Sequence, residues 1–161
     1  MMGSVFLLFV CAAIGTLCGY LILLSYKRHY SYLDDACAVI SALKQNLSYK
    51  KDSVPAVLGR LNVTNAQLKK NIQEYISFAS GQSANKELSR GFLPQATFDG
   101  VKELFDFIGG SDEGTQGARL DAHLTRFEKL REDAEKKYKG QGRVAVKLGL
   151  LIGLAVGVVA L

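Results

Sequence analysis

The sequence is poor in the residues that build disulfide frameworks and metal centres. Its 161 residues include only three cysteines and two histidines. Cys11 and Cys18 lie in an uncharged N-terminal stretch, Cys37 lies beyond it, and no pair has metal-ligand spacing. His29 and His123 are far apart in the chain. We therefore expect no disulfide framework and no metal site, and no motif indicates a cofactor.

Catalytic groups are equally sparse. An active site needs positioned acids, bases or nucleophiles, and the sequence offers two isolated histidines and one cysteine outside the uncharged ends. That cysteine, Cys37, lies on an apolar helical stripe, which favours a place in the core over a role as nucleophile. We predict that the protein is not an enzyme.

Strand patterns are missing, and apolar residues recur instead at intervals of three and four, as on one face of a helix. The two prolines lie at element boundaries. Helices with one apolar face bury those faces against each other, so the sequence predicts an all-α bundle. The predicted stripes are Leu33, Ala36, Cys37, Ile40, Leu43 and Leu47; Leu68, Ile72, Tyr75, Ile76 and Ala79; Phe98, Val101, Leu104, Phe105 and Ile108; and Leu120, Leu124, Phe127, Leu130, Ala134 and Tyr138.

Boundary residues refine this prediction. Thr64 or Asn65 can cap the helix that carries the second stripe. Residues 81–85 are small and polar, so we expect a loop there. A short helix from Lys86 to about Phe92 would end before Pro94, because the residue preceding a proline is pushed out of the α region.

Charge is absent from both ends of the chain, since every charged side chain lies between Lys27 and Lys147. About 20 residues of helix cross the ~30 Å hydrocarbon core of a membrane. The uncharged run Val5–Leu24 reaches that length, and it has neither the basic start nor the small-residue cleavage site of a signal peptide. The shorter run Leu148–Leu161 is a second membrane helix or, failing that, a buried core helix. We predict a transmembrane helix over 4–26, a helical bundle over 27–143 and a C-terminal transmembrane helix over 144–161.

Basic residues flank both apolar runs on the side of the central domain. The positive-inside rule then places the central domain in the cytoplasm and both termini across the membrane. The flanking cations also suit contact with anionic lipid. They are Lys27 and Arg28 after the first run, and Lys136, Lys137, Lys139, Arg143 and Lys147 before the second.

Small residues recur every fourth position in both apolar runs. Such rows let helix backbones approach closely in lipid. The two helices could pack on each other as a hairpin, or either could face a second copy of the chain or another protein. The rows are Cys11, Gly15 and Gly19 at one end, and Ala145, Gly149, Gly153 and Gly157 at the other.

The stretch FIGGSDEGTQ resembles a phosphate-binding loop in the spacing of Gly109 and Gly114. It lacks the lysine of a Walker A motif, follows a helical rather than a strand pattern, and would place two acids against a phosphate. A turn between two helices explains it better. Gly109 suits a helix C-terminus, Ser111 or Asp112 can cap the next helix, and Gln116 follows one turn later.

A family resemblance rests on this stretch together with the apolar ends. The pattern F-x-x-x-G-x-x-D-x-x-x-Q at Phe105, Gly109, Asp112 and Gln116 combines with a leading membrane helix, a helical cytoplasmic region and a basic stretch running into GLLIGL at 149–154. In these features the chain resembles the stage III sporulation protein AB family. That family is similar in turn to the inner-membrane platform proteins of type II secretion and type IV pilus systems.

The resemblance implies a non-enzymatic platform or scaffold subunit of the channel between mother cell and forespore in an endospore-forming bacterium. It implies a mother-cell membrane facing the forespore, with the central domain in the cytoplasm beside a secretion-type ATPase and other channel proteins. Whether Asp112 and Gln116 only hold the turn or also contact a partner stays open.

Two other functions compete. The formal net charge of +5 raises nucleic-acid binding, but the basic cluster adjoins an apolar run, so we expect a membrane contact and no nucleic acid. An unrelated membrane-anchored helical adaptor would have the same architecture. The presence of a secretion-type ATPase gene in the same sporulation operon would favour the channel subunit over this adaptor.

Overall fold

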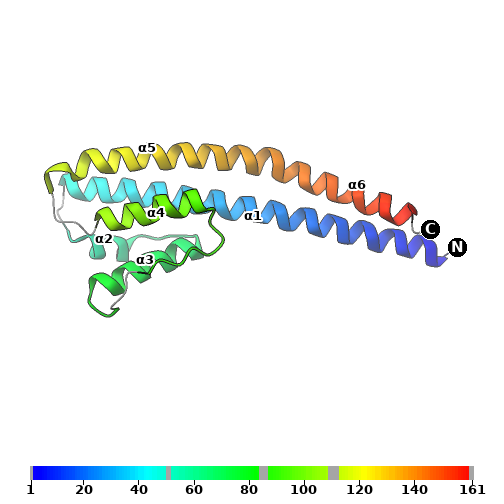
Figure 1. The fold of residues 1–161 in the computed structure, drawn as a ribbon, viewed down its shortest axis with the longest axis horizontal. Helices are drawn as coiled ribbons and strands as arrows, with labels where there is room; N and C mark the ends of the chain where they lie inside the picture. Colours follow the sequence, from blue (N-terminus) through cyan, green and yellow to red (C-terminus); the bar gives the residue numbers. More distant parts are fainter. Residues whose placement is uncertain (1, 50–51, 84–86, 109–112, 160–161) are drawn as a thin grey trace. The chain divides into compact units, whose positions relative to one another are not determined.

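The computed structural model of the chain describes residues 2–49, 52–83, 87–108 and 113–159, and every regular element in these ranges is helical. The predicted all-α class is confirmed for this part of the chain. Figure 1 shows the elements, which are α1 (Met2–Tyr49), α2 (Val54–Arg60), α3 (Ala66–Ala79), α4 (Gln95–Ile108), α5 (Glu113–Lys137), the π-helical turn η1 (Tyr138–Gly142) and α6 (Arg143–Val159).

The chain divides into two compact units. The terminal unit contains Met1–Tyr30 and Asp133–Leu161, so the two ends of the chain share one unit. The central unit is Ser31–Glu132. The predicted bounds of the membrane helices and the bundle, at 4–26, 27–143 and 144–161, remain predictions.

Most of the core of the central unit comes from the predicted stripes, although Ala79 is exposed and the buried Tyr32, Val39, Leu58 and Leu93 lie outside them. On α1, α3 and α4 the buried side chains recur at steps of three and four residues, so one face of each of these helices is removed from water. Large side chains such as Tyr32, Phe105 and Phe127 are at most 1% exposed. The other buried apolar residues of this unit are Leu33, Ala36, Cys37, Val39, Ile40, Leu43, Leu58, Leu68, Ile72, Tyr75, Leu93, Val101, Leu104 and Leu120.

Within the central unit, α1 and α5 run in opposite directions. Lys44 on α1 pairs with Asp121 on α5 at 2.5 Å, and Asp34 on α1 pairs with Arg131 at 3.3 Å. The residue earlier in α1 therefore pairs with the residue later in α5. All four side chains are a third or more exposed, so these pairs add at most about 1 kcal/mol each. The two ion pairs show the register of α1 against α5. The packing of these helices depends on the apolar core.

The start of α3 is fixed by two side chains. Asn65 caps the helix, because its side-chain oxygen accepts hydrogen bonds from the backbone N–H groups of Gln67 (3.0 Å) and Leu68 (3.3 Å). This confirms one of the two predicted caps. Asp35 on α1 accepts from the backbone N–H groups of Thr64 (2.9 Å) and Asn65 (2.6 Å). One carboxylate therefore ties the beginning of α3 to α1.

The segment between α3 and α4 differs from prediction. A helix over Lys86–Phe92 is wrong, because residues 87–90 have no regular structure and residues 91–92 form a turn; Lys86 itself lies outside the described residues. Gly91 has a φ of +55°, a conformation that ends any helix and favours glycine.

Long-range hydrogen bonds hold this segment instead. Ser89 donates from its backbone N–H (2.8 Å) and its hydroxyl (2.5 Å) to the Glu74 carboxylate, and the Gln67 amide donates to the Ser89 carbonyl (2.7 Å). The fully buried Asn71 joins this network and is hydrogen bonded to the Tyr32 hydroxyl at 3.0 Å. Burial raises the pKa of Tyr32 far above its ordinary value, so the phenol stays neutral.

Removing the α3 cap should destabilise the central unit. Asn65→Ala leaves the first N–H groups of α3 without their acceptor, which costs about 1 kcal/mol. Denaturant unfolding followed by far-UV circular dichroism measures the change. Asn62→Ala is the matched control, because Asn62 is exposed and precedes the helix. Equal losses of stability in the two variants would contradict the capping role.

Candidate functional site

The closest helix contact of the terminal unit joins α1 and α6 through glycine. A Cβ atom on Gly153 would lie 2.5 Å from the carbonyl oxygen of Cys11, and one on Gly19 would lie 2.5 Å from that of Ala145. A Cβ on Gly15 would overlap the carbonyl oxygen of Gly149. No side chain fits at these positions, so the contact is made between backbones.

The direction of this contact is antiparallel. Gly157 lies against Leu8, Gly153 against Cys11 and Ala12, and Ala145 against Gly19. The sequence left open whether the two apolar helices pack on each other or on another chain. The structure packs them on each other, with both predicted rows of small residues in the contact.

The outward faces of the same helices are apolar and exposed. α1 and the helical stretch Gly117–Val159 each contain an 18-residue window of high mean hydropathy, 2.5 and 1.9 respectively, of which 11% and 17% is buried. Both windows are long and apolar enough to cross a membrane. Their largest exposed side chains include Phe6, Phe9, Ile14, Leu17, Leu21, Leu151, Ile152 and Val158.

The net charge of the protein lies wholly in the terminal unit. That unit holds seven of the 20 Lys and Arg residues and only two of the 15 Asp and Glu residues. The central unit holds 13 of each and is formally neutral. The seven cations, all exposed, are the predicted Lys27, Arg28, Lys136, Lys137, Lys139, Arg143 and Lys147. Positive charge is therefore concentrated next to the apolar helices.

The pKa values of Lys139 and His29 are shifted by their surroundings. Lys139 pairs with Glu135 one turn earlier, and the hydrogen bond raises the pKa of Lys139. Burial, followed by the positive charge of Lys137, lowers the pKa of His29, so this imidazole is neutral at pH 7 and adds nothing to the cluster.

The π-helical turn η1 lies within the basic cluster, and the sequence did not predict it. Ala134, Tyr138 and Gly142 recur every fourth residue, which in an α-helix advances each one by about 40° beyond a full turn. In a regular α-helix such a row would rotate away from the partner helix. A π turn contains more residues per turn than an α turn, so residues four apart stay on the same face. Here Tyr138 stacks on Tyr30 (6.1 Å, 10°), and a Cβ on Gly142 would lie 2.7 Å from Leu23. Gly140 and Gly142 are the only sequence signal for this turn.

The family-motif residues are only partly placed. Phe105 is buried in α4, 5.2 Å from the Tyr75 ring. Gly109 and Asp112 lie outside the described residues. Gln116 belongs to α5, but its side chain is also outside the described part. The predicted turn and its caps therefore stay predictions.

Cys37 lies in the core, as its stripe predicted. Its side chain is buried on α1, and burial raises the pKa of the thiol to about 11. Since the thiolate is the nucleophilic form, this thiol is unreactive at neutral pH. Among the described residues, no group of three or more His, Cys, Asp or Glu side chains could hold a metal ion.

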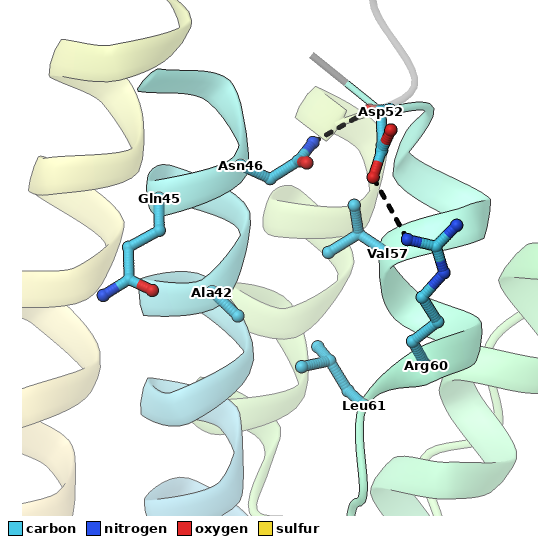
Figure 2. A pocket seen from close by; sticks show the side chains of 7 residues that line it. All are labelled: Ala42, Gln45, Asn46, Asp52, Val57, Arg60 and Leu61. Carbon is cyan, nitrogen blue, oxygen red and sulfur yellow. Dashed lines mark hydrogen bonds and ion pairs between the residues drawn. The ribbon is translucent and has the colours of Figure 1, made fainter. Parts of the chain in front are cut away.

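A cavity of about 470 Å³ opens between α1 and α2 in the central unit (Figure 2). Three of its polar residues are linked: the Asn46 amide donates to the Asp52 carbonyl (2.8 Å), and Arg60 pairs with the Asp52 carboxylate (3.2 Å). Ala42, Val57 and Leu61 supply apolar wall. With its charges already paired, the cavity suits an apolar group better than a reaction.

These observations define the class: an all-helical protein whose two apolar terminal helices pair through glycine. The chain belongs to the stage III sporulation protein AB family, whose family model matches residues 1–161, the whole chain. The resemblance on the FIGGSDEGTQ stretch is thereby confirmed, and membership implies a role in sporulation. Neither a curated protein nor a solved structure matches the chain.

Enlarging Gly153 should weaken the α1–α6 contact. A leucine there would push α6 away from the Cys11 carbonyl, and overpacking of this kind costs about 1–3 kcal/mol. Unfolding of the detergent-solubilised chain by increasing sodium dodecyl sulfate measures the loss. Ala155→Leu adds similar bulk on an exposed part of α6 and should have little effect. If both variants unfold like the unaltered protein, the close contact is absent.

Proposed function

We propose that the protein is a non-enzymatic membrane platform subunit of the channel between mother cell and forespore. The antiparallel, glycine-lined pairing of α1 and α6 carries this proposal. It supports a membrane hairpin that the chain forms by itself and that holds the central unit at the membrane. Two paired helices resist tilting and extraction better than a single anchor, which suits a subunit on which others assemble.

Charge supports the orientation. The seven exposed cations adjoin the inner ends of the two apolar segments, where they would meet anionic headgroups and retain the central unit in the cytoplasm of the mother cell. Both termini would then lie on the far side of the membrane, toward the forespore.

The partners follow from the family resemblance and from the surface of the central unit. This unit has a packed core and a formally neutral charge, with acids and bases interspersed along α5. Mixed charge of this kind suits specific protein contacts more than nucleic acid. We propose that a secretion-type ATPase and other channel proteins dock on it, and that the membrane hairpin can also contact a second copy. Burial holds the Cys37 thiol in its neutral form, which supports a structural rather than a catalytic role.

An unrelated membrane-anchored adaptor is the alternative. It would share the hairpin and the central unit but not the channel partners. The family membership favours the channel subunit over this alternative.

The test uses an endospore-forming bacterium in which the gene is replaced by an affinity-tagged copy. Crosslinked membranes from sporulating cells should yield the secretion-type ATPase with the tagged protein, and loss of the gene should abolish heat-resistant spores. Gln116→Ala should keep membrane abundance but lose ATPase recovery if Gln116 faces a partner. Gln82→Ala, at an exposed turn position, is the matched control. Normal sporulation without the gene would contradict the proposal.

A further inference from the structure

A second cavity of the central unit, between α4 and α5, is lined by cations around an aromatic ring. It has a volume of about 360 Å³, and neither the proposed membrane anchor nor the apolar cores account for it. Its walls are Glu103 and Phe107 from α4, with Arg119, Ala122, His123 and Arg126 from α5.

The helix spacing brings the nitrogen-bearing side chains of α5 together. Arg119, His123 and Arg126 follow one another at steps of four and three residues, so they project from one face of the helix. The ends of this row are about 10 Å apart along the axis. Two guanidinium groups thus flank one imidazole along the same wall of the cavity.

Contacts with α4 hold this row in place. The Arg119 guanidinium lies over the Phe107 ring at 5.5 Å, and the His123 ring lies against the same phenylalanine at 5.9 Å. Arg126 pairs with Glu103 at 2.6 Å, and its guanidinium carbon would be 3.6 Å from a Cβ on Gly100. The Arg126 guanidinium therefore lies close to α4 at a position where that helix has no side chain. The cations are positioned before any ligand arrives.

The charges of the cavity do not cancel. Arg119 and Arg126 contribute two positive charges and Glu103 one negative charge. Burial lowers the pKa of His123, and Arg126 lowers it further while Glu103 raises it, so the imidazole is neutral at pH 7. The side chains that line the cavity therefore carry a net charge of one positive unit. Within the described residues, Arg119 makes a ring contact but no ion pair with a carboxylate.

We propose that this cavity docks an acidic side chain of a partner protein, whose carboxylate is bound between Arg119 and Arg126. A guanidinium presents two parallel N–H donors that match the two oxygens of a carboxylate. One carboxylate carries the single negative charge that the cavity lacks. Phe107 and Ala122 offer apolar surface to the residue beside it.

A phosphate fits this cavity less well than a carboxylate. It carries nearly two negative charges at pH 7, and the second would face Glu103 without a cation of its own. The carboxylate of Glu103 shows that the wall already accommodates this chemistry at Arg126. An acidic protein segment is therefore the ligand that the observations favour.

The binding test uses the full chain in zwitterionic detergent micelles. The sequence has two histidines, so His29→Gln leaves His123 as the only imidazole signal in a histidine-labelled sample. The probes are the peptide Ac-Ala-Glu-Leu-Glu-Ala-amide and its glutamine counterpart. The glutamate peptide should shift the His123 signals to saturation, and the glutamine peptide should not. Arg119→Ala and Arg126→Ala should each weaken the affinity about tenfold, the effect of losing a charge-assisted contact.

Matched variants separate the site from general charge attraction. Lys129→Ala removes a positive charge from an exposed position of α5 outside the cavity, and it should change the affinity less than twofold. Arg119→Lys keeps the charge but loses the fork, and it should bind less tightly than the unaltered chain. Equal weakening by Lys129→Ala, an equal response to the glutamine peptide, or tighter binding of inorganic phosphate would each overturn the proposal.

Discussion

The close approach of α1 and α6 is the contact on which the account depends. Four glycines, Gly15, Gly19, Gly149 and Gly153, each lie where a Cβ would collide with the backbone of the opposite helix. In lipid no hydrophobic force drives two apolar helices together, so association relies on dense packing of this kind. The contact unites the ends of the chain in one unit. It also brings the cations that follow the first apolar segment and those that precede the second into the same part of the molecule.

The two units divide the physical roles. The terminal unit has apolar outer faces, no buried polar network among its described residues and all of the net charge. The central unit is neutral and is held by an apolar core that encloses Tyr32 and Asn71. Because the buried polar groups there are hydrogen bonded, the core defines one arrangement of its helices. A packed, neutral central unit and a charged, membrane-compatible terminal unit are consistent with the proposed platform.

Periodicity in the sequence predicted most of the helices and their buried faces, since burial of an apolar stripe follows from local spacing. The cap at Asn65 followed from residue chemistry in the same way. The segment before α4 was missed because its conformation depends on bonds from Glu74 and Gln67, which are distant in the sequence. The sequence did not predict the π turn, because the turn depends on which face of the helix packs against α1. The Arg119–Arg126 cavity depends on which side of α5 faces Phe107, which no single stripe reveals.

A disulfide between the two terminal helices tests the central contact most directly. A Cβ on Gly157 would lie 3.5 Å from the Cβ of Cys11, within the range that a disulfide requires. With Cys18 and Cys37 replaced by alanine, Gly157→Cys should form an intramolecular bond with Cys11 on mild oxidation of membranes. Ala155→Cys, on an exposed part of α6, should not form it. The account predicts a crosslinked monomer; free thiols, or crosslinked dimers alone, would contradict it.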